Sequence, residues 1–122
     1  MRARRGWRAC ALVAAAVTGS ASCGRGDEPS LSAAAQRGRA TYMNVCVACH
    51  NANPALDGAL GPNLVGATRE LIEWRVVRGA YPPGYRPKRA SNAMPAFPHL
   101  ADKIDDLAAF VAESTGDGKV AR

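Results

Sequence analysis

The pentad Cys46-Val47-Ala48-Cys49-His50 constrains this chain more than any other feature. Cys46 and Cys49 are three positions apart, so on a helix they lie one turn apart and both thiols can add to the two vinyl groups of one haem. His50 directly follows the second cysteine and is placed to ligate the haem iron. The pattern therefore predicts one covalently attached haem, a haem c.

Other sites use the same residue types. A thioredoxin-like redox pair needs a preceding strand in a βαβ unit, whereas the segment 33–45 has the pattern of a helix. A zinc site needs further ligands, but the only other histidine is His99, and no second cysteine pair follows. A structural disulfide between Cys46 and Cys49 is the main alternative that remains open.

The first 22 residues have the three parts of a secretory signal peptide. Met1 to Arg8 is basic, Ala9 to Val17 is an uncharged apolar run, and the following residues up to Ser22 are small. The apolar run is well short of the roughly 20 residues that a membrane-spanning helix needs. We therefore expect residues 1–22 to direct export to the periplasm and to be removed.

The segment around Cys23 resembles the signal of bacterial lipoproteins, in which the cysteine becomes the lipid-bearing first residue. Ser20 stands where that family usually has leucine, so ordinary cleavage after Ala21 or Ser22 remains open. Residues 23–32 are polar and contain glycine, serine and proline, which predicts a flexible tether. A lipid on Cys23 would hold the protein at a membrane surface.

Composition and charge exclude several classes of protein. The chain has 122 residues, 48% of them hydrophobic and 21% charged, which suits one soluble domain and not a disordered or multi-span membrane protein. The net charge is +6, but four arginines lie within the first eight residues, so the mature chain is nearly balanced and nucleic-acid binding is not expected. Residues 69–89 stay basic and residues 102–117 acidic, which either steers docking of a redox partner or reflects two solvated faces.

No stretch of the mature chain alternates apolar and polar residues as a strand does, and apolar residues instead recur at helical spacing. We expect one helix to lead into the pentad, a second over Arg69 to Arg78 and a third near the C-terminus. The residues that mark their boundaries are N-caps at Ser32, Thr68 and Asp102 and terminating glycines at Gly79 and Gly116.

With these features, residues 34–114 resemble the small monohaem class I cytochromes c. In that family a glycine and an aromatic residue, eight and four positions before the first haem cysteine, pack against the last helix, and Gly38 and Tyr42 match them. Leu107 and Phe110 match the aliphatic and aromatic residues of the last helix that meet them. The resemblance implies an all-α class I cytochrome c fold of three to four helices around one haem, with the domain over 33–116 and a tail at 117–122.

The resemblance also implies the remaining haem contacts. Pro62 matches the proline whose carbonyl oxygen accepts a hydrogen bond from the haem histidine, and Met94, followed by proline, matches the sixth iron ligand. His99 offers a bis-histidine alternative. Met43 lies one turn before Cys46 on the proximal side, so we expect it in the core.

The Pro- and Gly-rich stretch Tyr81 to Pro87 is expected to be a loop near the haem edge. Several residues of this region are candidates either for contact with the haem edge or propionates or for ordinary packing. They are Trp74, Arg78, Tyr81 and Tyr85.

Iron held by His50 and Met94 has no free position for a substrate, which favours one-electron transfer over enzymatic catalysis. We expect a carrier in an exported redox chain, or the electron-accepting subunit of a dehydrogenase or oxidase, acting as a monomer or within a larger complex with redox partner proteins. The alternative is a peroxidase-like haem enzyme or a redox or gas sensor in which the distal ligand departs.

Overall fold

Three α-helices and two short 3-10 helices form the frame of the domain in the computed structural model, which describes residues 30–116. No strand occurs within that range, so the expected all-α class is confirmed. The predicted signal peptide, residues 23–29 of the predicted tether with Cys23, and the tail at 117–122 lie outside the described residues. Ser32, the last residue of that tether, is instead held by bonds from its amide and hydroxyl to the Glu113 carboxylate at 2.9 and 2.6 Å. The elements are α1 (Ala33–Val45), η1 (Cys46–Ala48), α2 (Arg69–Arg78), η2 (Pro98–Lys103) and α3 (Ile104–Thr115).

Most of the predicted helix boundaries are confirmed. The side chain of Ser32 accepts a hydrogen bond from the Ala35 amide at the start of α1, and that of Thr68 caps α2 in the same way. Gly79 and Gly116 end α2 and α3 with φ angles of 65° and 84°, in the left-handed region where a side chain would be strained.

The predicted cap at Asp102 is wrong. Asp102 lies inside η2, its carboxylate pairs with Lys103 Nζ at 2.6 Å, and α3 begins at Ile104 without a side-chain cap. The reason is that the chain already becomes helical at Pro98, the first residue of η2, and η2 continues directly into α3. Carbonyl groups of a preceding 3-10 turn face the first amides of the helix that continues it, so no side-chain acceptor is needed.

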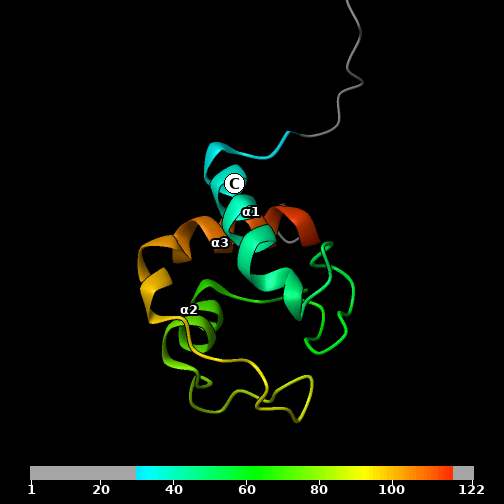
Figure 1. Ribbon diagram of the computed structural model, residues 1–122, viewed down its shortest axis with the longest axis vertical. Coiled ribbons are helices and arrows are strands. Elements are labelled where there is room, and N and C mark those ends of the chain that lie inside the picture. Colours follow the sequence, from blue (N-terminus) through cyan, green and yellow to red (C-terminus); the bar gives the residue numbers. More distant parts are fainter. Residues whose placement is uncertain (1–29, 117–122) are drawn as a thin grey trace, which may run out of the picture.

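Helices α1 and α3 cross closely at one end of the domain (Figure 1). Gly38 is buried at the crossing, where a Cβ atom would overlap the backbone carbonyl of Asp106 and lie 3.0 Å from the Leu107 amide nitrogen. One turn further along α1, the Tyr42 ring packs on Phe110 with centroids 5.1 Å apart. The helix contact predicted from these residues is confirmed.

Helix α2 packs against η2 and α3 and completes the core. Its Ile72 and Val76 are buried together with Leu100, Ile104 and the residues at the crossing. No helix within residues 30–116 is long and apolar enough to cross a membrane.

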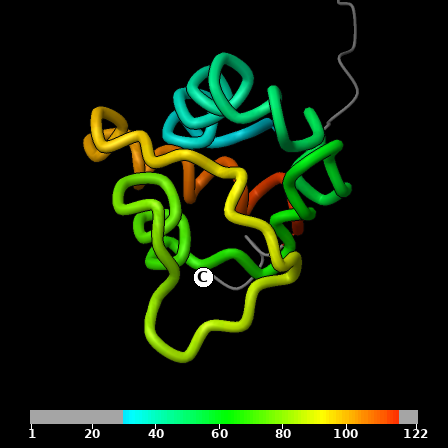
Figure 2. The backbone as a smooth tube through the Cα atoms, turned by 60° about the horizontal axis from the view of Figure 1, so that its bottom comes forward, coloured from blue at the N-terminus to red at the C-terminus, as the bar shows by residue number. Residues whose placement is uncertain are grey.

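The two long loops on either side of α2 lie against each other, as the green and yellow segments of Figure 2 show. The loop after α2 includes Tyr81 to Pro87, which has no helix, as expected. Lys88 from this loop donates to the Asn63 side chain at 2.8 Å and to the Val65 carbonyl at 2.6 Å, and Arg89 donates to the Leu60 carbonyl at 3.1 Å. These bonds close the loops around a cavity between α2 and the pentad.

Candidate cofactor site

His50 lies two residues after the end of η1, and its orientation is fixed from two sides. Its amide donates to the Cys46 carbonyl at 2.9 Å, and its ring Nδ1 lies 3.1 Å from the Pro62 carbonyl oxygen. A carbonyl oxygen only accepts, so Nδ1 carries the proton in this hydrogen bond and Nε2 keeps a free lone pair. Burial is the main cause that lowers the pKa of His50, and this favours the neutral ring that a metal requires.

Gly61 brings the backbone of the loop against the flat side of the same imidazole. A Cβ atom on Gly61 would overlap Cε1 of the His50 ring and lie 2.5 Å from its Nδ1. Only glycine allows Pro62, the next residue, to approach the ring closely enough for its carbonyl to receive the hydrogen bond.

Cys46 and Cys49 are free thiols, both half-buried, and both line the cavity with His50. Burial, with a smaller contribution from Cys49, raises the pKa of Cys46 to about 11, so this thiol is protonated at neutral pH. Neither sulfur forms a disulfide, and both are available for thioether bonds.

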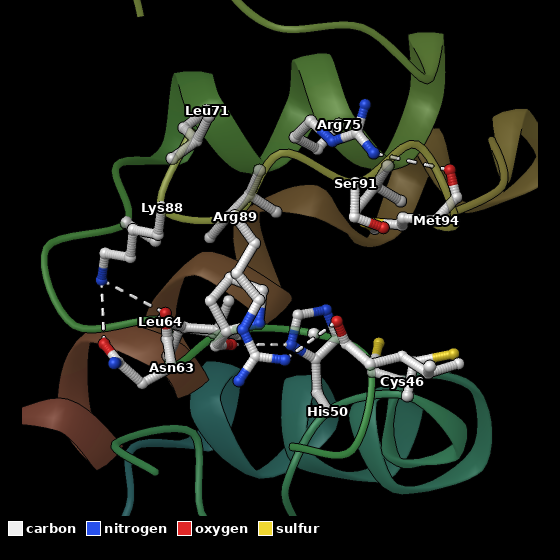
Figure 3. A pocket seen from close by; sticks show the side chains of 18 of the residues that line it. Cys46, His50, Asn63, Leu64, Leu71, Arg75, Lys88, Arg89, Ser91 and Met94 are labelled. Atoms are coloured by element: carbon white, nitrogen blue, oxygen red, sulfur yellow. Dashed lines mark hydrogen bonds between the residues drawn. The ribbon is translucent and has the colours of Figure 1, made fainter. Parts of the chain in front are cut away.

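Met94 lines the cavity from the opposite loop (Figure 3). Its backbone is held to α2: Arg75 Nη2 lies 3.5 Å from the Met94 carbonyl, and the Phe97 amide donates to the Val76 carbonyl at 2.6 Å. The site therefore joins the pentad after α1 with the loop between α2 and η2, and α2 fixes the loop that carries Met94.

The two rival ligands lie elsewhere. His99 is exposed on η2, makes a T-shaped ring contact with Phe97 at 6.1 Å between centroids, and does not line the cavity. Met43 is half-buried and packs against the core cluster, as expected for a residue on the proximal side.

The cavity is far larger than close packing leaves in a domain of this size. The centres of water-sized molecules can occupy about 140 Å³ of it, whereas voids in protein interiors are rarely larger than a single water molecule. Apolar side chains of α2 and α3 form its walls, among them Leu71, Ile72 and Val111. Two thiols, a neutral imidazole and a thioether around such a space fit a haem, which has an apolar face and an iron with two axial positions.

Sequence reasoning missed three basic residues that line this cavity: Arg75, Lys88 and Arg89. Arg75 is 9% exposed, donates to the Gly79 carbonyl at 2.8 Å and lies 4.3 Å from the Tyr81 ring. It was detectable in principle, because it falls three positions after buried Ile72, on the apolar side of α2.

The four candidates for contact with the cofactor edge divide into two pairs. Tyr81 and Tyr85 line the cavity and stack on each other at 5.4 Å between centroids. Trp74 does not line the cavity, and its ring instead carries the Arg78 guanidinium at 4.4 Å, so these two form a separate surface contact.

The basic and acidic runs of the sequence pair partly with each other and with α1. Arg69 Nε lies 2.6 Å from Asp105, and Arg37 Nη2 lies 2.7 Å from Asp106. These pairs neutralise part of the charge asymmetry that a docking partner would meet.

Within residues 30–116, no three His, Cys, Asp or Glu side chains gather as a metal site of their own. The helix crossing at Gly38, the pentad after α1 and the cavity between the pentad and the Met94 loop define a class I cytochrome c domain.

A family model described as cytochrome c oxidase, cbb3-type, subunit III, matches residues 33–111, and the chain belongs to this family. No curated protein and no solved structure matches the chain.

Proposed function

We propose that this protein is a one-electron carrier that holds one haem c, with thioether bonds to Cys46 and Cys49 and with His50 and Met94 as axial ligands. The observation that carries the proposal is that all four of these side chains line one and the same cavity. When bound, the haem supplies an iron that alternates between the ferric and ferrous states.

The protein's own residues adapt this site to electron transfer. Pro62 orients His50 and keeps its Nε2 lone pair free for the iron, while the bonds from α2 hold the Met94 loop in place. A thioether is a soft, neutral ligand that favours ferrous iron. The restraints on the loop support permanent ligation by Met94 over a distal ligand that departs, as a peroxidase-like enzyme or a gas sensor requires.

The family description supports a place in a larger complex, because it names a subunit of a cytochrome c oxidase. We extend the proposal to an exported chain that receives electrons from one redox protein and delivers them to another, either as a free carrier or as a subunit of an oxidase or dehydrogenase. Purification of the native protein with its bound partners tests this role.

Covalent attachment is tested on the mature protein isolated from a host that matures c-type cytochromes. Acid-acetone extraction is expected to leave the haem on the polypeptide, because thioether bonds survive acid while axial bonds do not. Cys46→Ala and Cys49→Ala each retain one thioether bond. The double variant has none, so all of its haem is expected to pass into the organic layer. Passage of the wild-type colour into the organic layer would contradict thioether attachment.

We also propose that Cys23 is acylated and that the mature chain starts there. Each buried methylene contributes about 0.8 kcal/mol, so two or more acyl chains hold a protein stably at a membrane. The wild type, expressed with its own signal, is expected to sediment with membranes and to carry acyl mass at Cys23, and Cys23→Ser to lack that mass. A mature chain that starts at Ser22 or Cys23 without acyl groups, as shown by intact mass, would instead make this a soluble exported protein.

A further inference from the structure

We propose that Lys88 and Arg89 form a carboxylate-binding site for the haem propionates. This inference rests on the proposed function, because it requires a haem attached through Cys46 and Cys49. It assigns a second task to the loop after α2, which also carries Met94.

The two cations reach across the cavity with few charged partners. Lys88 Nζ is surrounded by three neutral oxygens, the Asn63 carbonyl and side-chain oxygens and the Val65 carbonyl, at 2.6 to 3.2 Å. Arg89 donates to the carbonyls of Gly58 and Leu60, and its nearest carboxylate, that of Asp57, is 3.6 Å away. A propionate carboxylate carries a full negative charge that carbonyl oxygens lack, and it can accept two parallel bonds from a guanidinium, so both cations gain attraction by facing a propionate.

The pair lies on the correct side of the cavity. In Figure 3, Lys88 and Cys46 lie on opposite sides of the His50 ring, and the Arg89 side chain comes down between Lys88 and the ring. A haem carries its vinyl groups on one edge and its propionates on the opposite edge. Thioether bonds at the Cys46 side therefore direct the propionate edge towards Lys88 and Arg89.

The other cations nearby are less suitable. Arg75 lies beside Met94 and away from the Lys88 side of the cavity (Figure 3), where it bonds to the Gly79 and Met94 carbonyls. Arg78 covers Trp74 outside the cavity. Arg86 belongs to the same loop as Lys88 but does not line the cavity, and it has no hydrogen bond or ion pair with residues 30–116. Arg86 therefore provides a matched control for loss of one charge from this loop.

The test follows the ionisation of the propionates directly. Protein produced with 5-aminolevulinate labelled with ¹³C at its carboxyl carbon carries the label in the haem propionate carboxyl groups, whose pKa is read by NMR titration of the reduced form. A nearby cation stabilises the ionised carboxylate, so Lys88→Gln and Arg89→Gln are expected to raise a propionate pKa by about 1 pH unit or more. Arg86→Gln is expected to leave the propionate pKa values at those of the wild type. Lys88→Arg keeps the positive charge and is expected to do the same.

Wild-type protein gives an independent measurement that does not depend on any variant folding. Nuclear Overhauser effects are expected between the propionate methylene protons and side-chain protons of Lys88 and Arg89. Two results would overturn the site. One is equal propionate pKa values in the wild type, Lys88→Gln and Arg89→Gln, and the other is the absence of these nuclear Overhauser effects in the wild type. All samples are first shown to retain haem on a denaturing gel, so failure of covalent attachment is recognised separately from failure of the propionate site.

Discussion

Replacement of Met94 by alanine is expected to lower the reduction potential by roughly 0.1 V or more, because the choice of axial ligands moves haem potentials over about 0.8 V. The weak far-red charge-transfer band from sulfur to ferric iron should disappear at the same time. Loss of a soft, neutral ligand disfavours ferrous iron, which sets the direction of the shift. Spectroelectrochemical titration of the oxidised and reduced protein measures both quantities.

His99→Ala is the matched control, because His99 is exposed on η2 and lies outside the cavity. It is expected to leave the potential and the far-red band unchanged. If His99→Ala abolished the native spectrum and Met94→Ala did not, the protein would be a bis-histidine cytochrome. Carbon monoxide binding to the reduced wild type adds a further check, since a permanently bound Met94 blocks it and a departing ligand allows it.

Replacement of Gly38 by valine is expected to destabilise the folded protein by about 3 kcal/mol or more. The side chain has no room, because even a Cβ atom would overlap the Asp106 carbonyl of α3. Helix propensity favours valine over glycine by a few tenths of a kcal/mol, so a loss of stability measures the helix crossing and not α1 alone. For a domain of this size the melting temperature should fall by at least about 12 °C.

Ala40→Val provides the control within the same helix, since Ala40 is exposed. It is expected to cost about 0.5 kcal/mol of helix propensity and no packing energy. Equal melting temperatures for Gly38→Val and Ala40→Val, measured by calorimetry on haem-loaded protein, would show that α1 and α3 can separate without cost.

Features that depend on near neighbours in the chain were predicted well. Ser32 and Thr68 cap their helices because a cap needs only an acceptor three residues before an unpaired amide. Asp102 satisfied the same local rule, but the cap predicted there was wrong, because the 3-10 turn that starts at Pro98 removed the need for a side-chain cap. The capping rule thus holds only where no neighbouring element already provides acceptors for the first amides of the helix.

The division between sequence and tertiary structure follows the distance along the chain over which each contact acts. The sequence by itself determined the relation of Cys46, Cys49 and His50, since the geometry of one helical turn brings residues three and four positions apart together. Only the tertiary structure decided that Lys88 and Arg89 lie across the cavity and that Trp74 and Arg78 lie outside it. The conformation of a long loop is set by contacts with distant segments, here the carbonyls of residues 58–65, and no spacing within the loop encodes them.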